Sequence, residues 1–138
     1  NAQYDDCDAL VMSAAVSDYR PAVRAENKIK KEQHDHLNIE LTENPDILYG
    51  LGQKKTHQFL VGFAAETRDV IEYGKAKLAK KNLNLLVAND VAQQGAGFNV
   101  STNIAALIYK DGHIEQYPKM NNDDLVHIFI EKIVEGIN

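Results

Sequence analysis

The chain has 138 residues, of which 44% are hydrophobic and 25% are charged, and its formal net charge is −5 at pH 7. This length and composition predict a single domain over residues 1–138 and exclude a disordered chain or a coiled coil. The acidic balance argues against broad binding to nucleic acids or membranes, and no apolar run approaches the roughly 18 residues of a membrane helix.

The cysteine content bears on the cellular compartment. The only cysteine, Cys7, has no partner for an internal disulfide. This favours a reducing, cytoplasmic setting, with Cys7 as a small apolar residue near a strand.

Four short apolar runs predict β-strands. They are continuous instead of alternating in polarity, which is typical of strands that are covered on both faces in a parallel sheet. The runs lie at residues 9–16, 59–65, 83–88 and 104–109.

Helical patterns follow the first two strands and close the chain. Asn44 is predicted as an N-cap with Pro45 at the first helical position, so that a helix begins there. A second helix is predicted over 69–81. The third, over 121–137, has an apolar stripe formed by Leu125, Ile128, Phe129, Ile133 and Ile137.

The dipeptide Asp111-Gly112 predicts a two-residue turn, so residues 104–109 and 113–117 should form an antiparallel hairpin. The predicted fold is therefore α/β: a Rossmann-like, mostly parallel sheet with helices on both faces and an antiparallel hairpin at one edge.

Residues 17–36 form the one long stretch without clear periodicity, which is typical of a lid or a binding loop. We call this segment the basic flap. Between Arg20 and Lys31 it contains five cations, Arg20, Arg24, Lys28, Lys30 and Lys31, and one acid, Glu26. Local positive charge in an acidic protein predicts a local anionic ligand.

Polar residues follow three of the predicted strands, as "SDYRP", "AET" and "NDV". In an open parallel sheet, ligands bind outside the carboxyl ends of the strands, so a site is predicted there. Ordinary turn chemistry explains each of these segments by itself, and that alternative stays open.

Two further features fit a phosphate-bearing ligand. The helix start at Asn44 to Asp46 offers unpaired backbone N–H groups, although a simple helix start has the same residues. Lys77 and Lys81 lie on one helix face with Gly74, where a polyphosphate could bind across them, although paired lysines are also typical of a solvated face.

Other candidates are weaker. His34 and His36 have no further ligand at metal spacing and are interpreted as surface residues, so the metal ligands are left open. The segment "GAGF" at 95–98 lacks the context of a dinucleotide fingerprint, and no serine or cysteine has a recognisable nucleophile motif.

The motifs "AAVSDYRP", "NKIKK", "ENPDIL", "VGFAAET" and "LLVANDV", in this order and spacing, resemble the phosphopantothenate-cysteine ligase family. This family forms the second activity of the bacterial bifunctional flavoprotein of coenzyme A biosynthesis. The resemblance runs from about Asp8 to the C-terminus. It implies an enzyme that uses CTP and Mg²⁺ to activate 4'-phosphopantothenate as an acyl cytidylate, which cysteine then attacks.

The resemblance also implies roles for particular residues. Asp18 falls in the nucleotide pocket, and Lys28 matches a flap lysine that acts in the second half-reaction, after the cytidylate has formed. The remaining nucleotide contacts are Pro45, Asp46, Ile47, Leu48, Phe63, Lys77 and Lys81. Family members are dimers whose flap reaches toward the partner's site, so a homodimer is expected.

The chain also departs from the family pattern. Family members begin with a further stretch of strand and helix that holds a glycine-rich nucleotide loop and an asparagine. The chain begins with Asn1 and has neither feature. We therefore expect a C-terminal fragment of the ligase domain with a partial nucleotide site.

Two alternatives belong to other functional classes. A nicotinamide-dependent oxidoreductase on a Rossmann-like sheet predicts a GxGxxG turn after a strand, and the sequence has none. A non-catalytic nucleotide-binding module would keep the fold and the flap alone.

Overall fold

The computed structural model describes residues 3–30, 36–66, 68–90 and 102–138. The chain forms two compact units. The first, which we call the sheet unit, comprises residues 1–13 and 47–138, and the second, the flap unit, comprises residues 14–46.

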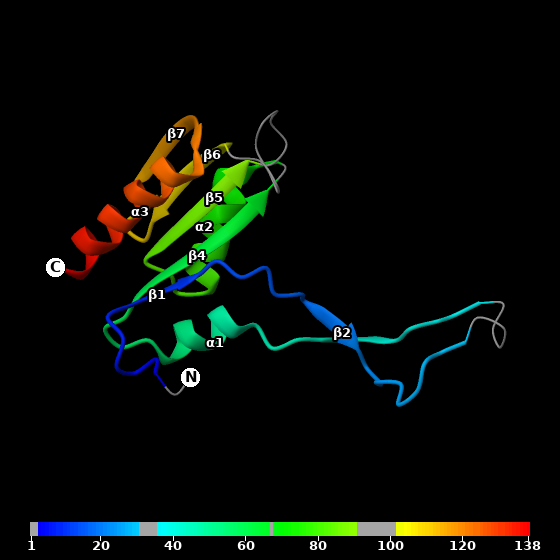
Figure 1. Cartoon of the computed structure of the whole chain (residues 1–138). Coiled ribbons are helices and arrows are strands. Elements are labelled where there is room, and N and C mark those ends of the chain that lie inside the picture. The colour runs from blue at the N-terminus through cyan, green and yellow to red at the C-terminus, as the bar shows by residue number, and fades with distance from the viewer. Residues whose placement is uncertain (1–2, 31–35, 67, 91–101) are drawn as a thin grey trace. The chain divides into compact units, whose positions relative to one another are not determined.

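The sheet unit contains five strands in the order β1-β4-β5-β6-β7 (Figure 1). The strands are β1 (Ala9–Met12), β4 (Phe59–Glu66), β5 (Leu85–Asp90), β6 (Thr102–Tyr109) and β7 (Ile114–Asn121). β1, β4 and β5 are parallel, whereas β6 is antiparallel to both β5 and β7. Four of the five strands therefore run in one direction, and the predicted hairpin at the sheet edge is confirmed.

Helices cover both faces of this sheet. α1 (Ile47–Lys54) and α2 (Val70–Lys80) contribute Leu48 and Leu78 to a core cluster on one face. α3 (Asn122–Ile137) contributes Phe129 to a second cluster on the opposite face. Alternate residues of β4 point into the two clusters, Leu60 into the first and Val61 into the second. Because both faces are buried, the central strands are apolar at almost every position.

Several boundaries differ from those predicted. The first strand ends at Met12 instead of residue 16, because its ladder with β4 ends at the pair Met12–Gly62. The third begins at Leu85 instead of residue 83, after Asn82 takes a positive φ of 52°. The hairpin turn is confirmed, with Gly112 at a φ of 92°, a conformation that glycine adopts without steric cost.

The predicted stripe of α3 is mostly confirmed. Leu125, Phe129 and Ile133 are buried, and Ile128 packs against them partly buried. Ile137 in the last turn is 44% exposed, so it lies outside the core. Asn121 is the N-cap of this helix, and its side-chain Oδ1 accepts from the Asp124 N–H at 2.7 Å.

α1 and the end of α2 meet at a close backbone contact. Asn82 Nδ2 donates to the Gly52 carbonyl at 2.9 Å, and Lys55 Nζ donates to the Asn82 carbonyl at 2.6 Å. Burial lowers the pKa of Lys55, with Lys110 as a smaller contribution. A Cβ atom at Gly52 would lie 2.0 Å from the Lys81 carbonyl oxygen, so the two helices approach as closely as they do only because residue 52 is glycine.

The flap unit is a two-stranded antiparallel ribbon. β2 (Tyr19–Pro21) pairs with β3 (Leu41–Glu43), with Tyr19 opposite Glu43. β2 therefore lies inside the stretch predicted as an irregular loop, in which too few residues are strand for an alternating pattern to emerge. Among the described residues of this unit, none is buried.

Candidate functional site

The base of the flap unit brings two of the predicted motifs together. The Asn44 N–H donates to the Asp18 carbonyl oxygen at 2.7 Å, and Asn44 Nδ2 donates to the Ser17 carbonyl at 2.8 Å. Arg20 Nη1 donates to Asn44 Oδ1 and to the Glu43 carbonyl, both at 2.9 Å. Asp18 of "SDYRP" is therefore held beside Asn44, the residue that precedes Pro45 of "NPDIL".

These contacts correct one prediction. Asn44 is not the N-cap of α1, because that helix begins at Ile47 and the Asn44 side chain bonds to Ser17 and Arg20 instead. Pro45 accordingly lies before the helix and not at its first position. The local pattern predicts that the Asn44 side chain caps α1. Its hydrogen bonds to Ser17 and Arg20 compete with that cap.

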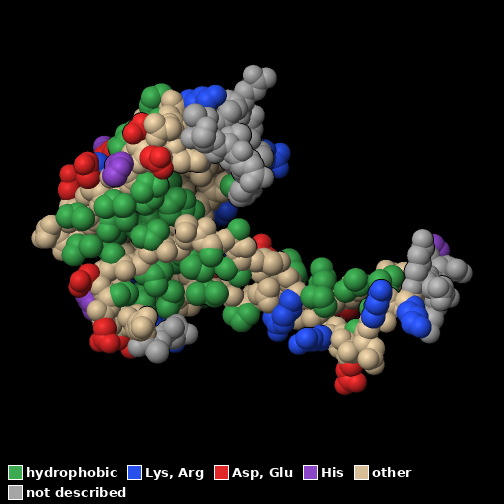
Figure 2. Space-filling view, in the orientation of Figure 1, with side chains coloured by type: hydrophobic (Ala, Val, Ile, Leu, Met, Phe, Trp, Pro, Cys, Tyr) green, Lys and Arg blue, Asp and Glu red, His purple; other side chains and the backbone are tan. Residues whose placement is uncertain are grey.

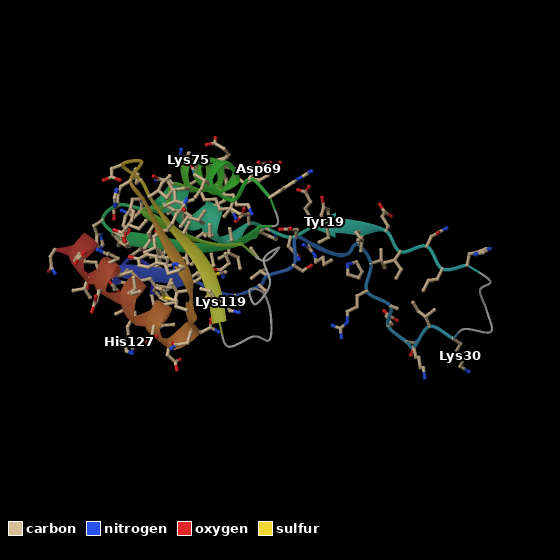
Figure 3. All side chains as sticks on the ribbon, turned by 90° about the horizontal axis from the view of Figure 1, so that it is seen from above. Tyr19, Lys30, Asp69, Lys75, Lys119 and His127 are labelled. Atoms are coloured by element: carbon tan, nitrogen blue, oxygen red, sulfur yellow. The ribbon has the colours of Figure 1, made fainter. Side chains whose placement is uncertain are left out.

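The cations of the basic flap lie on an exposed surface. Arg20, Arg24, Lys28 and Lys30 are exposed, and Lys31 lies outside the described residues. Figure 3 shows Lys30 far along the flap unit from Tyr19. In the part of the flap that the structure describes, Arg24, Lys28 and Lys30 make no described ion pair, whereas Arg20 is engaged by two neutral acceptors.

One side of the flap unit forms a hollow of about 660 Å³. Most of its lining is apolar, with Arg20, Arg24, Asn38 and Glu40 as the polar residues, and Figure 2 shows blue and green atoms mixed over this unit. Its lining includes Arg20, Val23, Arg24, Ile29, Leu37 and Ile39. A surface of this composition suits a ligand with both an anionic and an apolar part.

The first two residues of α1, Ile47 and Leu48, differ in solvent exposure. Ile47 is 47% exposed, whereas the Leu48 side chain is buried in the core cluster of α1 and α2. A nucleotide contact from Leu48 would therefore come from its backbone. Backbone N–H groups in the first turn of a helix are suited to such a contact with a phosphate or a base.

The sheet unit contains three of the predicted nucleotide contacts, Phe63, Lys77 and Lys81. They do not lie on the same face of the sheet. Phe63 of β4 packs edge-on against Phe129 of α3, with ring centroids 5.6 Å apart and an interplanar angle of 81°. Lys77 and Lys81 lie in α2 and at its C-cap, and α2 packs on the opposite face. A ligand shared by Phe63 and these lysines would have to reach the backbone of Phe63.

The two lysines also differ in their distance from the end of β4. α2 starts after β4 and returns toward the start of β5, so Lys81 lies at the far end of the helix, where its carbonyl meets Gly52. At about 1.5 Å per residue, Lys81 is roughly 16 Å along the helix axis from its first turn. Lys77 is the better placed of the two to serve a ligand at the carboxyl end of β4.

One further residue joins the candidates. Asn89 lies near the carboxyl end of β5, in the predicted "NDV" segment, opposite Ala65 of β4. Its side-chain Oδ1 is buried and has no hydrogen-bond partner among the described residues. A buried acceptor without a donor is costly, by roughly 1 to 3 kcal/mol, so this atom suits a donor from a ligand or water.

Within the described ranges, no group of three or more His, Cys, Asp or Glu side chains is arranged to hold a metal ion. Of the predicted surface histidines, His36 is exposed and His34 lies outside the described residues, as does the "GAGF" segment. In the same ranges, none of the helices has the length and apolar character needed to span a bilayer.

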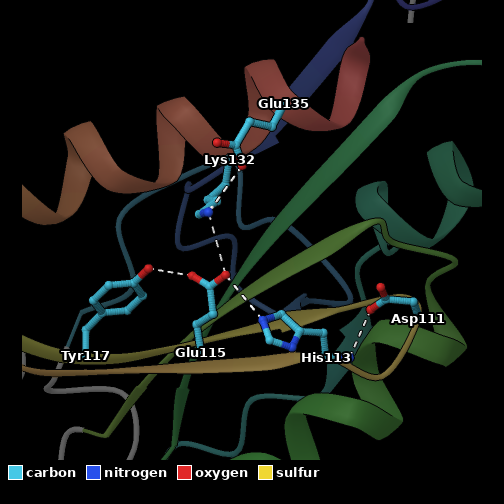
Figure 4. Close-up of polar contacts among 6 residues, drawn as sticks. All are labelled: Asp111, His113, Glu115, Tyr117, Lys132 and Glu135. Atoms are coloured by element: carbon cyan, nitrogen blue, oxygen red, sulfur yellow. Dashed lines mark hydrogen bonds and ion pairs between the residues drawn. The ribbon is translucent and has the colours of Figure 1, made fainter.

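A second polar cluster connects the hairpin with α3 (Figure 4). The Tyr117 hydroxyl donates to Glu115 at 2.5 Å, His113 Nε2 lies 3.3 Å from the same carboxylate, and Lys132 Nζ lies 3.7 Å from it. The Tyr117 hydrogen bond, assisted by the charge of Lys132, lowers the pKa of Glu115. The partners of Glu115 among the described residues are side chains of β7, α3 and the hairpin turn, so we assign the cluster to stability.

Replacing Glu115 by Gln is expected to lower the free energy of unfolding at pH 7 by roughly 1 to 2 kcal/mol, because a hydrogen bond to a charged group contributes about 1.5 to 3 kcal/mol and one to a neutral amide about 0.5 to 1.5 kcal/mol. Because the folded pKa of Glu115 is lowered, this stabilisation is complete above the carboxyl's ordinary pKa and is lost as the pH falls through the folded value. Urea unfolding of the parent chain and of Glu115→Gln at pH 7 and pH 3 measures the difference.

The control is Glu131→Gln, which removes an exposed carboxylate from α3. It should change the unfolding free energy by less than about 0.5 kcal/mol at either pH. A Glu115→Gln effect of the same size at pH 7 and pH 3 would contradict an ionic origin.

Comparison with known proteins gives one consistent family. Residues 1–137 match the sequence profile of the DNA/pantothenate metabolism flavoprotein C-terminal domain. The coenzyme A biosynthesis bifunctional protein CoaBC of Bacillus subtilis is 45% identical over 130 residues, which are 94% of this chain and 32% of that protein. CoaBC of Escherichia coli K12 is 41% identical over 137 residues, which are 97% of this chain and 34% of that protein. The chain thus spans about a third of the length of these curated relatives.

Two solved structures share the fold. The crystal structure of the C-terminal domain of CoaBC has a TM-score of 0.74 at 34% identity, covering 96% of this chain and 56% of that one. The DNA/pantothenate metabolism flavoprotein from Streptococcus pneumoniae also has a TM-score of 0.74, over 97% of this chain and 63% of that one. At 22% identity, this second likeness concerns the fold alone.

Proposed function

The chain belongs to the DNA/pantothenate metabolism flavoprotein C-terminal domain family, and from this premise we propose that it carries part of a ligase site. The proposed reaction joins 4'-phosphopantothenate to cysteine in coenzyme A biosynthesis, with CTP as the activating nucleotide. The proposal includes a cytoplasmic homodimer, in keeping with the resemblance of the motifs to the phosphopantothenate-cysteine ligases.

One observation supports the proposal above the others. Asp18 and the segment that begins at Pro45 are far apart in the sequence, yet the bond from the Asn44 N–H to the Asp18 carbonyl places them side by side. The motif resemblance assigns both segments to the nucleotide. In the flap unit, Asp18 and Asn44 are the pair next to Tyr19 and Glu43, so the pairing of β2 with β3 brings the two motifs together.

In the first half-reaction, positive charge near the triphosphate of CTP would stabilise the negative charge that develops there. A carboxylate oxygen of 4'-phosphopantothenate attacks the α-phosphorus of CTP, the bond to the bridging oxygen breaks, and pyrophosphate leaves. The backbone N–H groups at the start of α1 would orient the nucleotide. Mg²⁺ would enter with the triphosphate, whose oxygens and water supply most of its ligands, and would neutralise developing charge.

The second half-reaction would use the flap. The amine nitrogen of cysteine attacks the carbonyl carbon of the acyl cytidylate, the bond from that carbon to the phosphate oxygen breaks, CMP leaves, and the amine loses a proton. Negative charge grows on the departing phosphate oxygens. The ammonium group of Lys28 on a movable segment is suited to stabilise that charge at this step.

The test uses a chimera in which residues 1–137 replace the matching region of the Bacillus subtilis CoaBC. Pyrophosphate release should require CTP and 4'-phosphopantothenate and should occur without cysteine. Addition of cysteine should then release CMP and give a product with the mass of 4'-phosphopantothenoylcysteine. ATP in place of CTP tests the choice of base.

Two outcomes would contradict the proposal. A folded chimera that binds CTP but forms no acyl cytidylate would indicate a non-catalytic nucleotide-binding module. Fluorescence titration that detects binding of NADPH and not of CTP would indicate an oxidoreductase instead. Far-ultraviolet circular dichroism and size-exclusion chromatography establish first that the chimera is folded.

A further inference from the structure

Arg20 differs from Arg24, Lys28 and Lys30 in what its side chain contacts. In the ribbon it stands opposite Thr42, and its guanidinium reaches past that pair to the Glu43 carbonyl and the Asn44 side chain, both 2.9 Å from Nη1. Both acceptors are neutral, and both lie on the strand that leads to α1. The side chain therefore bridges the two strands of the flap unit at its base.

Asn44 completes the bridge with three separate groups. Its backbone N–H and its Nδ2 donate to the two consecutive carbonyls of Asp18 and Ser17, and its Oδ1 accepts from Arg20. The Ser17 carbonyl belongs to the peptide before Asp18 and the Asp18 carbonyl to the peptide after it, so these two bonds restrain both peptide planes that flank Asp18. The direction in which Asp18 projects is thereby set by Asn44.

The remaining contacts of the flap unit offer little support for this geometry. None of its described residues is buried, and an isolated two-stranded ribbon is marginally stable at best. Ser17 Oγ donates to the Tyr19 carbonyl at 2.8 Å, and the Ala22 N–H donates to the Glu40 carbonyl at 2.9 Å. Where no core exists, cross-strand hydrogen bonds decide how the strands are joined.

We propose that Arg20 and Asn44 form a latch that holds Asp18 beside Pro45, and that they are positioning residues for the nucleotide. This inference rests on the proposed ligase function for its catalytic consequence. Arg20 would act by holding Asp18 in place and would not touch the nucleotide. Lys28, in contrast, would act directly on the phosphate through its charge. Loss of the latch would weaken nucleotide binding more than it would slow the chemistry, because the groups that touch phosphate would remain present but misplaced.

The latch itself is tested on the 138-residue chain, without reference to activity. Amide hydrogen exchange measured by NMR should show the Asn44 N–H exchanging about tenfold faster in Arg20→Ala, the factor expected for one lost hydrogen bond. Arg20→Lys should show an intermediate rate, since one ammonium group reproduces only part of the guanidinium's geometry. Arg24→Ala, which removes the same charge from the same segment, should leave Asn44 exchange unchanged.

The positioning role is tested in the chimera. Arg20→Ala and Asn44→Ala should each raise the KM for CTP about tenfold and change kcat less than threefold, with Arg20→Lys in between. Unchanged Asn44 exchange in Arg20→Ala would overturn the latch. Faster exchange with an unchanged KM for CTP would overturn the positioning role.

A parent chimera that releases no pyrophosphate would overturn the ligase proposal and the positioning role with it. The exchange rates would still decide the latch by themselves, so the two failures are distinguishable.

Discussion

Replacing Gly52 by Ala is expected to lower the free energy of unfolding by about 3 kcal/mol or more, the upper range for forced overpacking. The added Cβ would lie 2.0 Å from the Lys81 carbonyl oxygen and 2.9 Å from its carbon. Both are backbone atoms, so no side-chain rotation relieves the clash. α1 would have to move away from the end of α2, which would also break the bonds that Asn82 and Lys55 make there.

Gly50 provides a matched control in the same helix. A Cβ at Gly50 would have no heavy atom within 4 Å. Gly50→Ala should therefore stabilise the chain by up to about 1 kcal/mol, because alanine has the higher helix propensity. Urea unfolding followed by circular dichroism measures both variants, and effects of the same sign would contradict the close contact at Gly52.

Replacing Lys28 by Gln in the chimera is expected to slow formation of the cysteine adduct by about 100-fold or more, the usual scale for a lost transition-state contact. Pyrophosphate release should change by only a few fold, because the family resemblance assigns Lys28 to the step after the acyl cytidylate has formed. The acyl cytidylate should therefore accumulate. Rapid quenching followed by chromatography of the nucleotide products measures both steps in one experiment.

Two controls separate the chemical role from general charge. Lys28→Arg retains the cation and should recover part of the rate. Lys119→Gln removes an exposed lysine from β7 (Figure 3) and should leave both steps unaltered. Adduct formation at the parent rate in Lys28→Gln would show that the role given to Lys28 is wrong.

Much of the sheet unit was predictable from local pattern. The runs that became β4, β5 and β6 are apolar at successive positions because each strand is covered on both faces, and Asp111-Gly112 marks a turn that few other dipeptides favour. These signals lie within a few residues of one another in the sequence. These signals can therefore be recognised without knowing which residues pack against each strand.

The side-chain directions at the candidate site were not predictable in the same way. The motifs placed Leu48 and Phe63 near a nucleotide, but they do not indicate that Leu48 is buried against α2 or that Phe63 packs on Phe129. Such directions depend on which face of the sheet each helix covers. That choice is made by contacts between residues far apart in the chain.

Residue types in their local order are enough to predict the α/β class, the parallel central strands, the hairpin and the family. Only the folded chain shows that Asn44 bonds to Asp18, Ser17 and Arg20 instead of capping α1, and that Gly52 touches the backbone of Lys81. The physical reason is the same in both cases. A hydrogen bond or a close approach between distant segments competes with local preference, and a local pattern contains no information about the competing partner.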